Sequence, residues 1–302
     1  MKRRSFQVPS AGTLAQVLQP TLGGEAAAWV QRGAVYVDGR RQRRADVPVR
    51  VGQVVSVVLE EGGVSALAPA APAPSLRVLA EDAEVLAVDK PAGITAQPTE
   101  GRAGDSLVDL AGAYLGHGAG LVHRLDRETS GVTVFGKTPA ATTALTAAFR
   151  EGTARKRYLA VTGPGLPPAG VIDLPLSKDP SRPGRFRASR TANGVQALTR
   201  YERLSDGLFC VVALYPETGR THQLRAHLTA LGCPIAGDAR YGGPPTLDGI
   251  AAGRCLLHAE RLSLPHPRTG ERVEYVSPVP EDLARFLARA GIPDGAALTP
   301  RR

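Results

Sequence analysis

A single carboxylate, Asp126, is surrounded by residues that could make it reactive. It lies between Arg124 and Arg127, shortly before a Thr-Ser-Gly run and an apolar stretch at 132–135. Nearby positive charge favours the ionised carboxylate, which is the form that can attack a carbon atom. The alternative is a structural role, because an Asp that precedes Thr-Ser-Gly is a common turn or capping residue. Residues 121–131 by themselves leave both roles open.

A tyrosine in a basic segment is the second candidate. Residues 157–161 have the composition of a β-strand, and strand alternation places Lys156, Tyr158 and Ala160 on one face. Tyr158 is therefore a candidate for a functional site. The alternative is a core tyrosine whose hydroxyl lies at the edge of the core.

A third segment combines polar residues with a predicted helix over 221–231. Thr221 is its expected N-cap. The apolar stripe of this helix is formed by Leu224, Leu228 and Leu231. The polar residues of the segment therefore lie on another face.

Four polar side chains of this helix could take part in chemistry. The helix N-terminus beside His222 and Gln223 favours anions such as phosphate or a carboxylate. Arg225 could pair with such an anion, or it could belong to a solvated helix face. For His222 and His227 the alternative is ordinary hydrogen bonding in or near the core, and for His227 we expect that role.

Together these three segments resemble the RluA family of pseudouridine synthases. The run at 123–131, His-Arg-Leu-Asp followed by two residues and Thr-Ser-Gly, is similar to the nucleophile motif of that family. Residues 155–160 and 216–227 resemble two further motifs of the family. The resemblance extends over residues 80–280.

The resemblance implies distinct roles for four residues. Asp126 matches the catalytic Asp of the family, and Arg124 matches the residue associated with displacing the target base. Tyr158 matches the active-site Tyr that packs on the base, and Arg225 matches the Arg that pairs with the catalytic Asp. We therefore expect Asp126 and Arg225 to form an ion pair, with Tyr158 lining the same cleft.

The implied reaction is the isomerisation of uridine in RNA to pseudouridine, without a cofactor and without a metal. The bond from ribose to nitrogen breaks, the base rotates, and a carbon–carbon bond forms. Asp126 could attack the base or the sugar, or abstract a ribose proton. A lone carboxylate fits this reaction better than glycoside hydrolysis, which uses a pair of carboxyl groups.

Two other functions stay open at this point. The first is a non-catalytic RNA-binding or ribosome-assembly protein that retains the synthase fold. The second is a nucleoside hydrolase, which would release free uracil.

Further residues are candidates for RNA contact. A turn at 88–93 resembles the early Asn-Lys-Pro-x-Gly turn of the family, with Asp89 in place of Asn. Basic or polar side chains in and beside the motifs could contact the substrate RNA: Lys90, Arg124, Lys156, Arg220, His222, Gln223, Arg32, Arg40 and Arg41. The family analogy favours ribosomal RNA over transfer RNA as the partner.

The bulk composition is consistent with a nucleic-acid partner. The chain has 302 residues, a formal charge of +9 and a pI near 9.9, which suggests a polyanionic ligand. Arginine contributes 32 of the 37 basic residues, so a GC-rich genome explains the surplus equally well. Three widely spaced cysteines suggest neither a zinc site nor a disulfide framework. No apolar run is long enough to span a membrane, so we expect no membrane contact. We also expect the protein to be cytoplasmic and monomeric.

The clearest boundary is an Ala- and Pro-rich stretch without charge. Residues 62–76 have the composition of a semi-extended linker. This stretch separates a small domain over 8–60 from a catalytic domain over 77–290.

The small domain resembles the RNA-binding domain found in ribosomal protein S-four and in many RNA modifiers. Two helices, at 13–18 and 24–31, precede a strand at 34–37, and Asp38-Gly39 then predicts a hairpin turn. The matching residues are 29–39 and 51–55, although Gly-Thr-Leu replaces the usual Arg-Leu-Asp opening. The alternative is a small αβ cap with a solvated basic face.

The large domain alternates predicted strands and helices. Helices are expected at 106–115, 139–149, 221–231 and 281–290, and strands at 85–88, 131–135, 157–161, 196–202 and 209–214. A predicted hairpin of 197–204 with 208–214 argues against a doubly wound parallel sheet. The expected fold class is α+β: a pseudouridine synthase fold with a mainly antiparallel mixed central sheet flanked by helices, plus a small N-terminal αβ RNA-binding domain.

Overall fold

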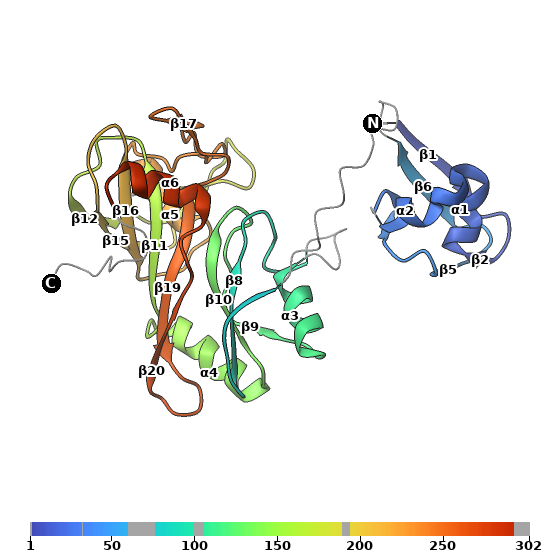
Figure 1. Ribbon diagram of the computed structural model, residues 1–302, viewed down its shortest axis with the longest axis horizontal. Coiled ribbons are helices and arrows are strands. Elements are labelled where there is room, and N and C mark those ends of the chain that lie inside the picture. The colour runs from blue at the N-terminus through green and yellow to red at the C-terminus, as the bar shows by residue number, and fades with distance from the viewer. Residues whose placement is uncertain (1, 32, 60–75, 99–105, 189–193, 293–302) are drawn as a thin grey trace. The chain divides into compact units, whose positions relative to one another are not determined.

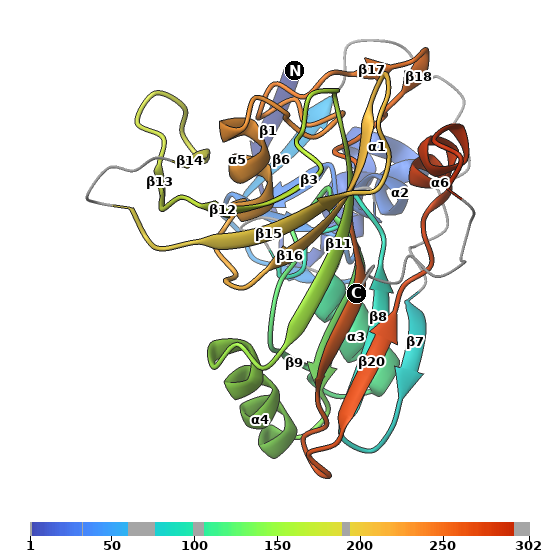
Figure 2. The same ribbon diagram turned by 90° about the vertical axis from the view of Figure 1, so that its left-hand side faces the viewer.

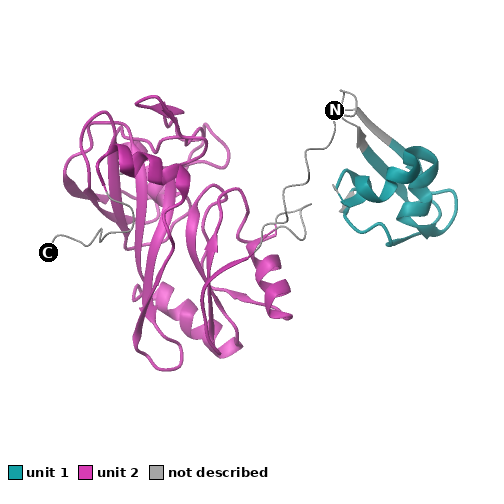
Figure 3. Ribbon diagram, in the orientation of Figure 1, with its two compact units in different colours: residues 1–74, 99–103 teal, residues 75–98, 104–302 magenta. Residues whose placement is uncertain are grey.

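The computed structural model describes residues 2–31, 33–59, 76–98, 106–188 and 194–292, and these residues form two compact units (Figure 3). The smaller unit contains the described residues up to 59. The larger unit contains those from 76 onward. All but the last residue of the predicted linker, 62–76, lies outside the described residues.

The smaller unit is a four-stranded antiparallel sheet packed against two short helices. Its sheet has the order β1 (Lys2–Gln7), β6 (Val54–Leu59), β3 (Val35–Val37) and β4 (Arg40–Gln42). The helices are α1 (Leu14–Leu22), capped by Thr13, and α2 (Ala26–Gln31), which follows the 3-10 turn Gly23–Glu25. A small pair, β2 (Gly12–Thr13) with β5 (Pro48–Val49), completes the unit. Its core is formed by Leu14, Leu18, Val30, Val35, Val55 and Val57.

Two features of this unit differ from the expectation. The N-terminal tail was expected to lie outside the folded domain, but Lys2–Gln7 forms β1 and pairs with β6. The first helix also continues past Pro20 to Leu22. Pairing with β6 stabilises β1, and packing of the helix stabilises α1 beyond Pro20, although the local composition favours neither element. The hairpin turn at Asp38-Gly39 is confirmed, because both residues have positive φ, 46° and 78°, and Val37 pairs with Arg40.

The larger unit is built on a ten-stranded sheet (Figure 1). Its main path runs β12, β15, β16, β11, β19, β10, β8, β7, with β20 paired to β19 and β9 to β10. The bounds of these strands are β7 (Arg77–Glu81), β8 (Val85–Lys90), β9 (Gly120–Leu121), β10 (Ser130–Gly136), β11 (Arg155–Thr162), β12 (Ala169–Asp173), β15 (Leu198–Arg203), β16 (Cys210–Pro216), β19 (Leu257–Pro265) and β20 (Arg272–Val276). The β10–β19 pair is parallel and the other pairs are antiparallel, so the expected α+β class with a mainly antiparallel mixed sheet is confirmed.

Strand β8 of this sheet is buried on both faces. Val85 and Ala87 of β8 pack into the same cluster as Leu145 of α4 (Pro139–Arg150). The alternate residues, Leu86 and Val88, pack with residues of α3 (Leu107–Leu115). This double burial explains why the sequence of β8 is a continuous apolar run.

The other half of the sheet carries the largest core cluster. It joins β11, β15, β16 and β19 to the apolar side chains of α5 (Gln223–Ala230) and α6 (Glu281–Arg289). Figure 2 shows the strands β15, β16 and β11 of this half. A hairpin, β13 (Leu176–Lys178) with β14 (Phe186–Ala188), contacts α5, and β17 (Thr246–Leu247) pairs with β18 (Ile250–Ala251). Within the described residues, no helix has the length and apolar character needed to cross a membrane.

Candidate active site

The segment that carries Asp126 is a loop between β9 and β10, and its own motif residues fix its shape. The ring Nε2 of His123 accepts a hydrogen bond of 3.0 Å from the backbone N–H of Val134. Burial, with a smaller effect of Lys156, lowers the pKa of His123 to about 3, so the ring stays a neutral acceptor. The N–H of Thr129 donates to the carbonyl oxygen of Asp126 at 3.1 Å. The motif therefore contains a turn that its own residues stabilise, and Asp126 is the first residue of that turn.

A second loop, directly after β8, holds the Asp126 loop from the side of Arg127. The ammonium of Lys90 donates to the carbonyl oxygens of Pro91, at 2.8 Å, and Arg127, at 3.1 Å. The N–H of Gly93 also donates to the Arg127 carbonyl, and the Arg127 side chain donates back to Gly93. Lys90 was expected to contact RNA, but its side chain is fully buried and is used in these hydrogen bonds. Lys90 is buried because β8 continues through this residue, and its side chain points into the core.

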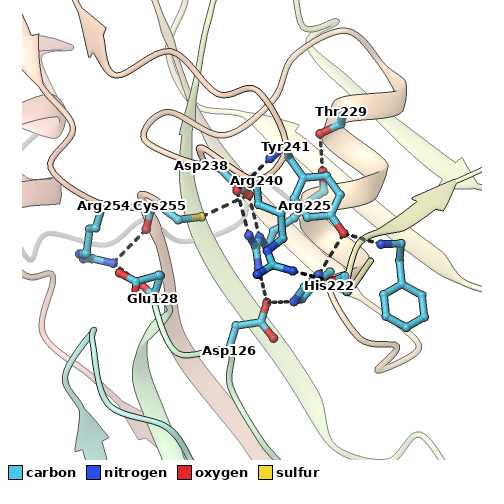
Figure 4. A network of polar contacts seen from close by, with 12 residues as sticks. Asp126, Glu128, His222, Arg225, Thr229, Asp238, Arg240, Tyr241, Arg254 and Cys255 are labelled. Atoms are coloured by element: carbon cyan, nitrogen blue, oxygen red, sulfur yellow. Dashed lines mark hydrogen bonds and ion pairs between the residues drawn. The ribbon is translucent and has the colours of Figure 1, made fainter. Parts of the chain in front are cut away.

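Arg254 fixes the far end of the Asp126 loop. Its Nη1 donates to the carbonyl oxygen of Glu128 at 3.0 Å (Figure 4). Its Nη2 donates to Asp282 of α6 at 2.9 Å. The loop is therefore tied to the C-terminal helix as well as to the turn after β8.

The carboxylate of Asp126 forms the expected ion pair with Arg225. Nη1 of Arg225 donates to Oδ2 of Asp126 at 3.0 Å. The remaining donors of the guanidinium are directed at Asp238, with Nε to Oδ2 at 2.7 Å and Nη2 to Oδ1 at 2.8 Å (Figure 4). The Arg225 side chain is 8% exposed and Asp238 is 1% exposed, so both charges are held away from water. Because Asp238 binds two nitrogens of the planar guanidinium, the third nitrogen, Nη1, has a fixed direction.

The start of α5 differs from the expectation. Thr221 was expected to cap the helix, but the helix begins at Gln223, and His222 occupies the cap position with a φ of 56°. Gln223 is buried, and its side chain accepts hydrogen bonds from Thr218 and from the N–H of Arg220. Residues 223–228 are all buried, so this part of α5 has no solvated face. The side chain of Gln223, which was expected to contact RNA, therefore supports the turn before α5.

The side chain of Tyr241 contacts both Arg225 and His222. The guanidinium carbon of Arg225 lies 4.8 Å from the ring centre of Tyr241. The hydroxyl of Tyr241 is 3.0 Å from Nδ1 of His222, and Nε2 of His222 is 3.7 Å from Oδ2 of Asp126. His227, in contrast, is fully buried and bonded to Thr199 and to the Leu174 carbonyl, so the structural role expected for it is confirmed.

Asp126, His222 and Arg225 line one cavity of about 650 Å³. Asp126, Arg225 and Tyr158 all contribute to its wall, as the sequence predicted. Tyr158 is half-buried, and burial together with the charge of Asp126 raises the pKa of its hydroxyl, so the phenol stays neutral. The cavity is large enough for a nucleotide.

The remaining candidates for RNA contact divide by position. Arg124 and Arg220 are exposed and line the cavity, together with the half-buried Lys156, whose ammonium donates to the Thr218 carbonyl at 3.2 Å. Arg40 and Arg41 lie on β4 of the smaller unit. Arg32 lies outside the described residues.

No role was predicted for Asp238 or Tyr241, although the structure places both beside Arg225. The sequence signal for them is weak: an acidic and an aromatic residue in the glycine-rich segment 232–243. Asp238 bonds to Arg225 and Tyr241 to His222, each more than ten residues away in the chain, so local residue spacing does not predict these pairs. Among the described side chains, no group of three or more His, Cys, Asp or Glu residues could hold a metal ion. The three cysteines are buried and free, as expected.

Comparison with known proteins identifies relatives whose similarity to this chain includes the segments that line the cavity. The RNA pseudouridylate synthase family matches residues 84–230, which contain Asp126, Tyr158 and Arg225. An uncharacterized RNA pseudouridine synthase of Bacillus subtilis is 35% identical over 271 residues, 86% of each chain. A ribosomal large subunit pseudouridine synthase D of Xanthomonas campestris is 37% identical over 281 residues, 86% of this chain and 82% of that protein. A solved structure, human RNA pseudouridylate synthase domain containing 4, has a TM-score of 0.59 and 30% identity, and the match covers 71% of this chain and 93% of that one.

Proposed function

The chain belongs to the RNA pseudouridylate synthase family, and from this premise we propose that it converts specific uridines of ribosomal RNA to pseudouridine, with Asp126 as the nucleophile. Substrate and product are isomers: the N1–C1′ bond breaks, a C5–C1′ bond forms, and a hydrogen passes from C5 to N1. The reaction needs no oxidant or reductant. The names of relatives such as the Xanthomonas campestris protein support large-subunit ribosomal RNA, made in the cytoplasm, as the substrate.

One observation carries the role of Asp126. Both of the side-chain contacts found among the described residues, to Arg225 and to His222, fall on Oδ2. Oδ1 has no hydrogen-bond partner in the described part of the chain, so it is free to face a nucleotide in the cavity. The ion pair with Arg225 holds the carboxylate in place in the cavity, and a carboxylate can attack carbon.

The other wall residues suit a flipped nucleotide. Extruding a uridine costs a few kcal/mol, which contacts in the cavity must offset. Tyr158 offers an aromatic face for the base, and Arg124, exposed at the cavity, can occupy the space that the flipped base leaves. Arg220 and Lys156 add positive charge for phosphate groups.

The test compares the wild type with Asp126→Asn on transcripts of large-subunit ribosomal RNA and of transfer RNA, followed by mapping of pseudouridine. Asp206→Asn is the matched control, because it makes the same change on an exposed side chain outside the cavity. Modification by the wild type and the control alone supports the proposal. Release of free uracil would instead indicate a hydrolase. Tight RNA binding without modification by the wild type would indicate a non-catalytic binding protein.

We also propose that residues 8–60 form an RNA-binding domain of the ribosomal protein S-four type. The β3–β4 hairpin carries Arg40 and Arg41, and basic residues outnumber acidic ones in this part of the chain. Removal of residues 1–62 should weaken RNA binding and reduce its dependence on salt, because each phosphate contact releases counterions. A salt slope equal to that of the full chain would rule out this role.

A further inference from the structure

His222 stands between the carboxylate of Asp126 and the hydroxyl of Tyr241 (Figure 4). It occupies the left-handed region with a φ of 56°, directly before the first residue of α5. Non-glycine residues rarely adopt this conformation without a reason, and here it places the imidazole edge beside the candidate nucleophile.

The hydrogen bonds behind His222 fix which of its nitrogens carries the proton. The backbone N–H of Phe186, in β14, donates to the hydroxyl oxygen of Tyr241 at 3.0 Å. That N–H cannot accept a proton, so the described residues offer the Tyr241 hydroxyl one acceptor, Nδ1 of His222 at 3.0 Å. A neutral His222 whose Nδ1 accepts must carry its proton on Nε2. Nε2 is the atom that faces Oδ2 of Asp126.

We propose that His222 is a positioning residue for Asp126: Tyr241 holds it as the neutral tautomer protonated on Nε2, and its N–H and Arg225 together hold Oδ2 so that Oδ1 is the reacting oxygen. This inference rests on the proposed function. The contact is 3.7 Å in the absence of RNA, and contacts of this kind commonly tighten when the substrate binds. The hairpin β13–β14 thereby gains a role, because its backbone sets the direction of the Tyr241 hydroxyl.

The charge state of His222 then links the site to pH. Burial lowers the pKa of His222, Asp126 raises it, and Arg225 lowers it. The titratable and charged groups around His222 and its partner Tyr241 come from the Asp126 loop, from α5, from the segment after α5 and from the start of β14: Asp126, Arg225, Asp238, Arg240, Tyr241 and Arg185. At low pH an imidazolium would bind Oδ2 more tightly and make the carboxylate a weaker nucleophile, which predicts an acid limb in kcat.

Three variants test the assignment in the full chain. Asn tolerates the left-handed region but is too short to reach Asp126, so His222→Asn should lower kcat about tenfold with little change in KM. His222→Gln should recover most of this loss, because its amide N–H can occupy the position of Nε2. Tyr241→Phe keeps the ring under Arg225 but removes the proton donated to Nδ1, which favours neutral His222; the acid limb of kcat should therefore move to higher pH. In His222→Asn the limb should disappear.

A measurement without RNA separates this inference from the proposed function. Nitrogen-15 NMR of the imidazoles, with the His222 signals assigned by their loss in His222→Asn, reports tautomer and pKa directly. We expect the Nε2-protonated tautomer in the wild type, a higher pKa of His222 in Tyr241→Phe and a lower one in Asp126→Asn. A wild-type His222 protonated on Nδ1, or equal His222 pKa values in wild type and Tyr241→Phe, would overturn the proposal. Absence of pseudouridine with the expected NMR result would overturn only the proposed function.

Discussion

Asp238 holds the guanidinium of Arg225 by two hydrogen bonds of 2.7 and 2.8 Å, and this leaves a single nitrogen of Arg225 to meet Asp126 at 3.0 Å. Asp238 is in turn fixed by the N–H of Tyr241, which donates to its Oδ1 at 3.2 Å. The direction of the Arg225–Asp126 ion pair is therefore set by a residue that does not line the cavity.

Replacing Asp238 should reduce turnover more than substrate binding. Asp238→Asn keeps the shape but loses the charge and one acceptor oxygen, so we expect kcat to fall about 10- to 100-fold with a small change in KM. Steady-state kinetics on the modified RNA measures this split. Asp238→Ala should also destabilise the fold, by about 3–5 kcal/mol, because it leaves the buried Arg225 charge without its partner. Unchanged kcat in Asp238→Asn would show that Arg225 needs no such support.

The ring and the hydroxyl of Tyr158 should have different effects, the ring on substrate binding and the hydroxyl on turnover. Tyr158→Leu removes the aromatic face and should weaken binding of the target nucleotide by about 1–3 kcal/mol. Tyr158→Phe keeps that face, so its KM should stay near the wild-type value while any loss in kcat reports the hydroxyl. The raised pKa of Tyr158 keeps the phenol neutral up to at least its ordinary titration range, and neither variant should alter the pH profile between pH 6 and pH 9. Equal KM values in Leu and Phe variants would argue against stacking.

Burial of Lys90 should be visible in the pH dependence of stability. Burial lowers the pKa of Lys90 from 10.5 to about 7. Between these limits the unfolded chain binds more protons than the folded protein, so this group makes wild-type stability increase as the pH rises, and its penalty is complete below the lower limit. Relative to Lys90→Met, the wild-type free energy of unfolding should gain up to about 1.4 kcal/mol per pH unit in that window.

Urea unfolding of the two proteins between pH 6 and pH 10 provides the measurement for Lys90. The difference between their free energies of unfolding is the relevant quantity, because other titrating groups contribute equally to both. Parallel curves for the wild type and Lys90→Met would mean that the folded protein binds the Lys90 proton as tightly as the unfolded chain does.

Gly131, the last residue of the Asp126 motif, is required by a close approach of two strands. Its φ is 118°, and a Cβ at this position would lie 2.2 Å from the carbonyl oxygen of Ala259 in β19. We expect Gly131→Ala to destabilise the fold by more than about 3 kcal/mol, because both the backbone conformation and the parallel β10–β19 pair would have to change. Gly163→Ala is the matched control, since no atom lies within 4 Å of a Cβ there. Similar urea midpoints for the two variants would contradict this account.

Much of the fold could be predicted because burial leaves a local pattern. The apolar runs of β8 and β10, the helix over 106–115 and the Asp38-Gly39 turn all follow from residue type and spacing. The helix start at 221 was placed two residues early, since the left-handed conformation of His222 depends on contacts with Tyr241 and Asp126 that lie far away in the sequence. Strand β1 was not predicted, because its partner β6 lies far along the chain, with Lys2 paired to Leu59 and Gln7 to Val54.

The family of this protein, its candidate nucleophile Asp126 and the pairing of Arg225 with that carboxylate could all be predicted from the amino-acid sequence. Residue types at fixed spacings carry that information. Only the tertiary structure decided that Lys90 is buried under the Asp126 loop, that Asp238 aims Arg225 and that Tyr241 faces His222. The physical reason is that these side chains and backbone groups are joined across loops, and the direction and burial of a hydrogen bond exist only after the loops have packed.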